Sequence, residues 1–166
     1  MKSTLLLAVD AAHGDPAAHV AAAADMTRNL ANDTGDTVIV LHVHEYAIGR
    51  WGRMQVDCAE GAGEKVVDEV VSSLRAAGLT AQGVIGSADY GHVARAILAA
   101  ADEHDARIIV LGSSGRADLP HLPFGSVSTR LLHLARRPVL IVPKQPAAAP
   151  EQTPEAGAAT AGGAGR

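Results

Sequence analysis

The sequence RIIVLGSSGRADLPHLPFGSVSTRLLHLARRPVLIVP, residues 107–143, contains the pattern that decides the fold. Its first apolar run, Ile108 to Leu111, and its last, Val139 to Val142, have the length and composition of buried strands. Between these runs, apolar residues recur at helical spacing, at Val127, Leu131, Leu132 and Leu134. A strand, a helix and a second strand in this order are typical of a parallel α/β unit.

Two glycine turns lie between the first strand and the helix. Gly112 and Gly115 follow the strand, and Gly125-Ser126 opens the helix after nine intervening residues. Glycine lets backbone N–H groups approach a ligand closely, and a helix N-terminus offers unpaired N–H donors at the positive end of its dipole. We therefore predict that this stretch forms a phosphate-binding cradle.

The rest of the chain alternates in the same way. Apolar runs predict three further strands, over residues 4–9, 37–43 and 80–85. Helices are expected over residues 16–32, over residues 64–77 and between the turn at 86–89 and residue 105, whereas residues 44–63 lack a period and are expected to form a long loop. This alternation predicts one α/β domain over residues 1–144, with an open, doubly wound parallel sheet. Residues 145–166, rich in Ala, Gly and Pro, are expected to be a disordered tail.

Composition limits the classes of function. The chain has 166 residues, of which 48% are hydrophobic, enough for one substantial core. A net charge of -4 and no dense Lys/Arg face argue against nucleic-acid binding. The apolar run at the N-terminus stops at Asp10, too early for a signal peptide or a membrane span, and Cys58 is the single cysteine. We therefore expect a cytoplasmic protein with no membrane or nucleic-acid partner.

Asp10 stands at the carboxyl end of the first predicted strand. In a doubly wound sheet, ligands bind beyond the carboxyl ends of the strands, where the strand order reverses. If the first and fourth strands are neighbours, Asp10 and Gly112 lie side by side there. The Asp10 carboxylate suits ribose hydroxyls, and the amide and carbonyl near Val43 suit a purine edge. The alternative is that Asp10 only caps the following turn.

The histidines raise the question of a metal site. His42 and His44 alternate along a predicted strand and so point to the same face, but no third ligand and no HExxH spacing accompanies them in the sequence. We interpret the pair as structural, predict no metal site and interpret Cys58 as an inert or solvent-facing thiol. Tyr46 and Trp51 either shield the adenine or pack within their own loop.

The glycine pattern is similar to the nucleotide-binding signature of the universal stress protein family, in its ATP-binding branch, written G-2x-G-9x-G(S/T). The likeness runs from Lys2 to Pro143 and includes LLLAVD at residues 5–10, LHV at 41–43, GSADYGHVARAI at 86–97 and RPVLIVP at 137–143. The resemblance implies a Rossmann-like, five-stranded parallel sheet of order 3-2-1-4-5, of the adenine nucleotide alpha hydrolase type. It also implies a homodimer formed through the last strand, Val139–Val142.

The resemblance implies a role for nine residues. Asp10 would hold the ribose or the adenine, and Ala8 and Val43 would line the adenine pocket through backbone atoms. The phosphates would be held by Gly112, Gly115, Arg116, Gly125, Ser126 and Val127. The implied ligand is ATP, with ADP and AMP as alternatives and Mg²⁺ as an optional companion.

Two features depart from the family pattern. Many relatives have Gly or Ser directly after the first-strand aspartate, where this chain has Ala11-Ala12, so a hydroxyl contact is missing. The segment between Gly115 and Gly125 contains Pro120 and Pro123, which stiffen it.

The function implied is that of a regulator whose interaction with an unknown protein partner depends on nucleotide occupancy. An alternative is a slow ATPase or phosphoryl-transfer enzyme on the same site. The absence of a Walker motif from the sequence disfavours this alternative, and Asp118 and His121 are the nearest candidate catalytic groups. A third alternative, a protein that acts through partners alone, is disfavoured because the glycine motif is intact.

Overall fold

The computed structural model of the chain describes residues 3–11, 16–113 and 125–143. The predicted tail at 145–166 lies outside these residues. In chain order the elements are β1 (Thr4–Ala8), α1 (Pro16–Thr34), β2 (Thr37–Gly49), β3 (Gly52–Gln55), α2 (Ala62–Ala76), β4 (Ala81–Asp89), α3 (Val93–Glu103), β5 (Ala106–Gly112), α4 (Ser126–Leu134) and β6 (Val139–Val142).

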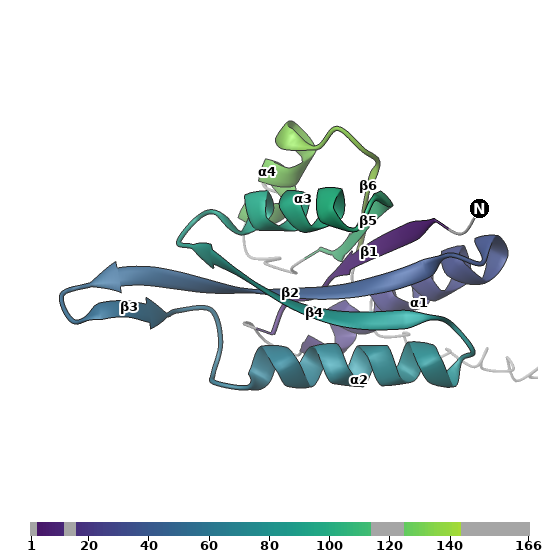
Figure 1. Cartoon of the computed structure of the whole chain (residues 1–166), viewed down its shortest axis with the longest axis horizontal. Coiled ribbons are helices and arrows are strands. Elements are labelled where there is room, and N and C mark those ends of the chain that lie inside the picture. The colour runs from purple at the N-terminus through teal and green to yellow at the C-terminus, as the bar shows by residue number, and fades with distance from the viewer. Residues whose placement is uncertain (1–2, 12–15, 114–124, 144–166) are drawn as a thin grey trace, which may run out of the picture.

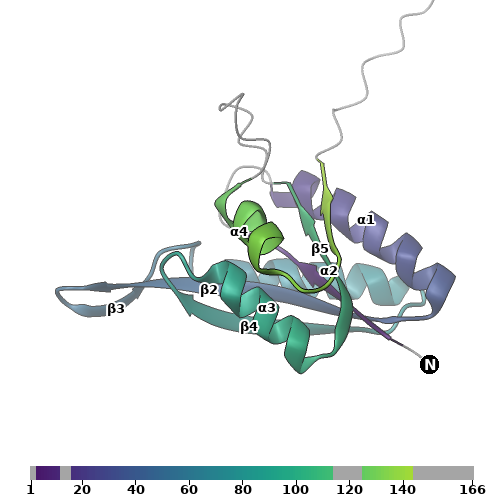
Figure 2. The same ribbon diagram turned by 90° about the horizontal axis from the view of Figure 1, so that it is seen from above.

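Five parallel strands form the body of the sheet in the order β4-β2-β1-β5-β6. This is the order 3-2-1-4-5 expected from the sequence, so the predicted parallel sheet is confirmed. Helices α1 and α2 cover one face of the sheet, and α3 and α4 cover the other (Figures 1 and 2).

Two apolar cores result from the alternation of side chains along the central strands. On β1, Leu5 and Leu7 face α1 and α2, whereas Leu6 faces α3 and α4. On β2, Val38 and Val40 belong to the first core, and Ile39, Leu41 and Val43 belong to the second. The apolar residues of β1 and of β2 as far as Val43 therefore pack under a helix on one face or the other, which explains why the runs are continuous in sequence.

Most of the segment 44–63, expected to be a loop, instead continues the sheet, as far as Gln55. β2 extends to Gly49 and turns through Arg50 and Trp51 into β3, which pairs with it antiparallel from Gly49↔Gly52 to Tyr46↔Gln55. Gly52 takes a φ of 111°, a conformation that favours glycine. The result is a sixth strand and a hairpin that projects from the body of the protein (Figure 1).

The long β2 also explains why β4 is longer than predicted. β4 pairs with β2 as far as Tyr46↔Asp89, so residues 86–89 are strand and the turn into α3 falls at Tyr90-Gly91. The end of α2 agrees with the prediction, because Gly78 follows the helix with a φ of 84°.

A buried carboxylate joins three segments at the amino end of the sheet. Asp36, 3% exposed, accepts hydrogen bonds from the backbone N–H of Ser3 at 3.0 Å, from the Thr34 hydroxyl at 2.6 Å and from Nε of Arg107 at 2.6 Å. Burial raises the pKa of Asp36, but the hydrogen bonds from Thr34, Arg107 and Ser3 outweigh it and hold the pKa below its ordinary value.

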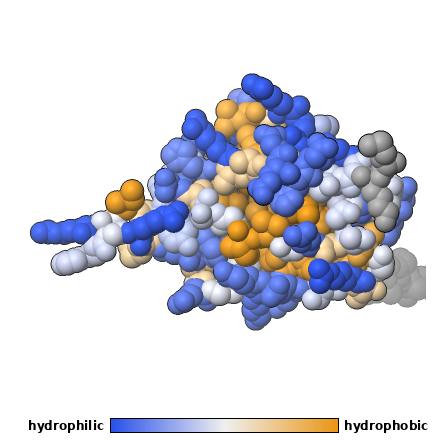
Figure 3. Space-filling model, viewed as in Figure 1, coloured by the Kyte–Doolittle hydropathy of each residue, from blue (hydrophilic) through white to orange (hydrophobic). Residues whose placement is uncertain are grey.

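The surface carries its apolar residues mainly near the sheet edges and the hairpin. Seen from the side of β4, apolar surface lies between the layers of α2 and α3 (Figure 3). The hairpin exposes Ile48, Trp51 and Met54. Among the described helices, none has a stretch long and apolar enough to cross a lipid bilayer.

Candidate functional site

The ends of β1 and β5 lie side by side, as the sequence predicted. Ala8 is in register with Leu111, so Asp10, two residues beyond β1, and Gly112, the last residue of β5, stand at the same edge of the sheet. The strand order reverses between these two strands, with β2 on one side of β1 and β6 on the far side of β5. This edge is therefore the expected ligand crevice of a doubly wound sheet.

Val43 presents its backbone to this crevice. The N–H of Val38 bonds to Thr80 on the β4 side, whereas the carbonyl of Leu41 accepts from Val9 on the β1 side. Because the direction of backbone groups alternates along a strand, the N–H and C=O of Val43 are directed to the β1 side, past the last residue of β1. The arrangement has the donor and acceptor that a purine edge requires.

The side chains near the crevice belong to one face of the sheet. Val43 is part of the core under α3 and α4, and Ala8 and Val127 pack against that same core. The structure therefore brings Ala8, Val43 and Val127 together on one face, at the end of the sheet where Asp10 and Gly112 lie.

Helix α4 begins beside this face without a side-chain cap. Its N-cap residue, Gly125, is extended at φ -66° and ψ 168° and, as a glycine, provides no side-chain cap for the first turn. The first N–H groups of a helix have no partner inside the helix, so Ser126 and Val127 lie where backbone donors and the helix dipole favour an anion.

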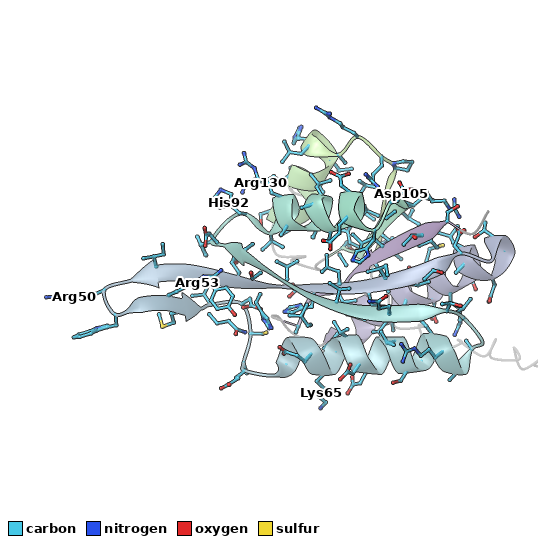
Figure 4. All side chains as sticks on the ribbon, viewed as in Figure 1. Arg50, Arg53, Lys65, His92, Asp105 and Arg130 are labelled. Carbon is cyan, nitrogen blue, oxygen red and sulfur yellow. The ribbon has the colours of Figure 1, made fainter. Side chains whose placement is uncertain are left out.

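A pocket of about 260 Å³ opens at the start of α4. Ser126 and Val127 form one wall, and the remaining lining comes from β2, the turn after β4, α3 and α4, at Glu45, Tyr90, Gly91, Val93, Ala94 and Arg130. The Arg130 guanidinium donates to the Gly91 carbonyl, and Arg130 and His92 lie at this end of the two helices (Figure 4).

Arg130 and Glu45 were missed at the sequence level. Arg130 stands four residues after Ser126, on the same side of α4, which is a signal that sequence spacing could have used. Glu45 falls in the segment interpreted as a loop. Its carboxylate accepts the Gly91 N–H and so joins β2 to the turn before α3.

The middle of the predicted cradle lies outside the described residues. This applies to Gly115 and Arg116, and to Asp118 and His121 as well. Their predicted roles stay predictions, while the outer parts of the motif, Gly112 and Gly125-Ser126, have the placement given above.

The two histidines of β2 lie on the opposite face of the sheet. The sequence around them offers no third ligand at a metal-site spacing, but the hairpin returns the chain to their side and brings two further ligand-type side chains there. Asp57 Oδ2 lies 3.1 Å from Nε2 of His42 and 3.1 Å from Nδ1 of His44. The sulfur of Cys58 lies 3.1 Å from the same Oδ2. We call His42, His44, Asp57 and Cys58 the histidine cluster.

Burial and charge act against each other on the ionisable groups of the histidine cluster. Burial raises the pKa of Cys58 to about 11, and the neighbouring Asp57 carboxylate adds to the rise. Burial lowers the pKa of His44, but its bonds to Glu64 and Asp57 outweigh this and raise it overall. Burial raises the pKa of Asp57, but hydrogen bonds from Cys58 and His44 hold it well below its usual range.

Comparison with known proteins gives one family. The family model described as "Universal stress protein family" matches residues 1–143 of the chain. None of the curated proteins searched matches it significantly.

Solved structures of the same family share the fold. A universal stress protein from Archaeoglobus fulgidus superposes with a TM-score of 0.66 at 24% identity, covering 86% of this chain and 99% of its own. A structure of the universal stress protein from the same organism in complex with dAMP has a TM-score of 0.60 at 22% identity, with coverages of 84% and 97%. A family member from Arabidopsis thaliana with AMP bound has a TM-score of 0.60 at 18% identity, with coverages of 86% and 92%.

Proposed function

Because the chain belongs to the universal stress protein family, we propose that it binds an adenine nucleotide at the carboxyl end of its sheet. The observation that carries the proposal is the convergence of Asp10, Gly112 and the uncapped start of α4 at one edge, beside the outward-directed backbone of Val43. The relatives with dAMP and AMP bound support the same class of ligand.

Each part of the nucleotide has a matching group. The backbone of Val43 and the small side chain of Ala8 suit the adenine, and the carboxylate of Asp10 suits the ribose hydroxyls. The phosphates suit Gly112, Gly115, Arg116, Gly125, Ser126 and Val127, of which Ser126 adds a hydroxyl to its backbone N–H. The pocket at Ser126 and Val127, with Arg130 at its rim, supports the placement of the anionic end there.

The finer proposal is that the ligand is ATP, with ADP and AMP as alternatives and Mg²⁺ as an optional companion. Its occupancy would regulate a cytoplasmic protein partner during stress, and two copies would pair through Val139–Val142. Among the described residues β6 pairs with β5 alone, which leaves its other edge for a second copy and supports this pairing.

Calorimetric titration of the purified full chain with ATP, ADP and AMP tests the proposal. We expect a dissociation constant in the micromolar range, about 8 kcal/mol of binding free energy, which four or five hydrogen bonds to charged groups can supply. No heat and no thermal shift at millimolar ATP would contradict nucleotide binding. Steady phosphate release that is lost in Asp118→Asn would instead favour the enzyme.

A further inference from the structure

The histidine cluster brings four metal-ligating atoms to one point between β2 and the start of α2. Nε2 of His42, Nδ1 of His44, a carboxylate oxygen of Asp57 and Sγ of Cys58 all lie within 4.8 Å of one another. The cluster is enclosed, since the side chains of His42, His44 and Asp57 are 2%, 8% and 8% exposed. The nucleotide proposal uses none of these side chains.

The hydrogen bonds of the two rings determine which nitrogen faces the centre with a lone pair. Nδ1 of His42 lies 3.1 Å from the carbonyl oxygen of Val9, which can only accept, so Nδ1 carries the hydrogen. In the neutral ring, Nε2 then has a lone pair, and it points at the Asp57 carboxylate at 3.1 Å. Two acceptors face each other at this distance.

His44 repeats the arrangement with its nitrogens exchanged. Its Nε2 lies 3.0 Å from the carboxylate of Glu64 and donates to it. In the neutral ring its Nδ1 then has the lone pair, which lies 3.1 Å from the same Oδ2 of Asp57 and 3.0 Å from the amide nitrogen of Gln55. In the protonated ring, Nδ1 donates to Oδ2 instead. With both rings neutral, three lone-pair-bearing atoms therefore converge, and the hydrogens beside them belong to the Cys58 thiol, 3.1 Å from Oδ2, and to the Gln55 amide. A cation at the centre would be bound by all three lone pairs.

The outer contacts have the form that metal sites use. A metal-bound histidine usually donates its second ring N–H to a carboxylate or a backbone carbonyl, which orients the ring. Glu64 provides the carboxylate for His44, and Val9 provides the carbonyl for His42. Gln55 adds an amide within 3.6 Å of the Cys58 sulfur.

The backbone of α2 is shaped to the two rings. Gly63, in the first turn of α2, is buried, and a Cβ there would lie 2.6 Å from Nε2 of His42 and 2.9 Å from Cε1 of His44. Only glycine allows this close approach. Cys58 is half-buried and so provides the side from which an ion can enter.

We propose that His42, His44, Asp57 and Cys58 bind one Zn²⁺ ion that fixes the β2–β3 hairpin and the start of α2 to the end of β2. Two imidazoles, a carboxylate and a thiolate are the ligand types of tetrahedral zinc. Zinc bonds of about 2.0–2.3 Å place neighbouring ligand atoms about 3.3–3.8 Å apart. The Cys58 sulfur and Nε2 of His42 are 3.8 Å apart, at the upper end of this range, whereas the three contacts of Asp57 Oδ2, each 3.1 Å, would lengthen slightly.

Binding exchanges one proton for the metal when both rings are neutral, and two when His44 starts protonated, the second leaving from its Nδ1 to solvent or buffer. The S–H bond of Cys58 is replaced by an S–Zn bond, the sulfur keeps the electron pair, and the proton passes to solvent or buffer. Nε2 of His42, Nδ1 of His44 and the Asp57 carboxylate each donate a lone pair. The close acceptor contacts in the centre become metal–ligand pairs.

The test uses the full chain, freed of metal by a chelator and kept reduced. Zn²⁺ is titrated in competition with a chromophoric chelator, and we expect one equivalent to bind. With Co²⁺ in place of Zn²⁺, we expect tetrahedral d–d absorption and a thiolate-to-cobalt charge-transfer band. In Cys58→Ser the charge-transfer band should be absent, and the Zn²⁺ affinity should fall at least about 10-fold.

Two further variants separate a metal role from a structural one. Glu64→Gln removes only the carboxylate that orients His44, at a half-exposed side chain, and should weaken Zn²⁺ about 10–100-fold without changing the circular dichroism spectrum. His92→Ala, on the other face of the sheet, is the matched control and should bind Zn²⁺ as the parent does (Figure 4).

Two results of these titrations would contradict zinc binding by the histidine cluster. If the chain binds no Zn²⁺ at micromolar concentration, the proposal is wrong. It is also wrong if Cys58→Ser and Glu64→Gln, with native circular dichroism spectra, bind Zn²⁺ as tightly as the parent, because the ion is then held elsewhere. Nucleotide titration of the same samples is independent of both results, since the two groups of residues lie on opposite faces of the sheet.

Discussion

Arg107, the second residue of β5, holds the buried carboxylate of Asp36, which directly precedes β2. The two residues are 71 positions apart in the chain, and Nε of Arg107 lies 2.6 Å from Oδ2 of Asp36. Because β1 lies between β2 and β5, this contact spans the central strand at its amino end. The bond from the Ser3 N–H to the same carboxylate attaches β1 as well.

We therefore predict that Asp36→Asn destabilises the protein and changes its response to acid. The folded-state pKa of Asp36 is lowered from 3.8, so the carboxylate adds stability above about pH 4 and loses it as the pH falls through the lower, folded-state value. At pH 7 the variant should lose about 2 kcal/mol, as expected for hydrogen bonds to a buried charge. Urea unfolding at pH 7 and pH 3 measures both effects.

The matched control for Asp36 is Asp25→Asn. Asp25 also pairs with an arginine, Arg28, but both side chains are exposed, so its loss should cost less than about 0.5 kcal/mol at either pH. The parent and Asp36→Asn should become closer in stability as the pH falls. A difference that stays constant down to pH 3 would show that the charge of Asp36 does not contribute.

Gly63→Ala should disturb the histidine cluster directly. The added methyl group would overlap the His42 ring, so we expect a loss of about 1–3 kcal/mol in metal-free protein and a weaker affinity for Zn²⁺. Gly86→Ala is the control, since a Cβ there would make ordinary contacts of 3.5 Å with Leu41 and Val43, and its change should stay within about 1 kcal/mol. Equal effects from the two substitutions would show that the close approach at Gly63 is unimportant.

Gly115→Val should abolish nucleotide binding and leave the sheet folded. The position lies outside the described residues, and the expectation rests on the spacing of the glycine motif, in which a side chain would occupy the phosphate space. Calorimetry should show an affinity for ATP at least about 30-fold lower, equivalent to about 2 kcal/mol. Ser126→Ala, which removes one hydroxyl and keeps the backbone N–H, should cost about 1 kcal/mol. Parent-like affinity in Gly115→Val would show that the cradle is misplaced.

The fluorescence of Trp51 should depend on the hairpin and should not change when a nucleotide binds. The side chain of Trp51 is 96% exposed at the hairpin turn. The ring of Tyr46, by contrast, is covered by the Arg53 guanidinium, which lies 4.0 Å from the ring centroid. We expect the tryptophan emission to be readily quenched by acrylamide, both with and without ATP. Trp51→Ala should change stability by less than about 0.5 kcal/mol. Protection from quenching by ATP would instead support a role in shielding the adenine.

The body of the fold was predictable because its signals are local and redundant. Apolar runs such as Leu5–Leu7 and Ile109–Leu111 are buried on both faces of the sheet, and a charged residue or a glycine follows each within three residues. The neighbouring positions of β1 and β5 also followed, because the order of a doubly wound sheet places Asp10 and Gly112 at the same edge.

The hairpin was not predicted because its turn has no local sequence signal, and the histidine cluster was not predicted because it depends on that hairpin. The two residues between Gly49 and Gly52 are Arg50 and Trp51, not the Asn-Gly or Asp-Gly pair that marks a two-residue hairpin turn. His42 and Asp57 are 15 positions apart, and only the returning hairpin brings them together. A search of the sequence for the usual spacing of metal ligands therefore finds the two histidines but no third or fourth ligand.

The alternating directions of His42, Val43 and His44 on β2 make the length of this strand critical. If β2 slipped by one residue against β1, each of its side chains would point to the opposite face of the sheet. Both imidazoles would then enter the apolar core under α3 and α4, and Val43 would take their place beside Asp57. Inserting one residue between Thr37 and His42 would therefore disable both sites at once. The same insertion at the turn of Arg50 and Trp51 lies beyond both and only lengthens an exposed loop. One strand thus contains a segment that cannot vary in length and, a few residues later, a segment that can.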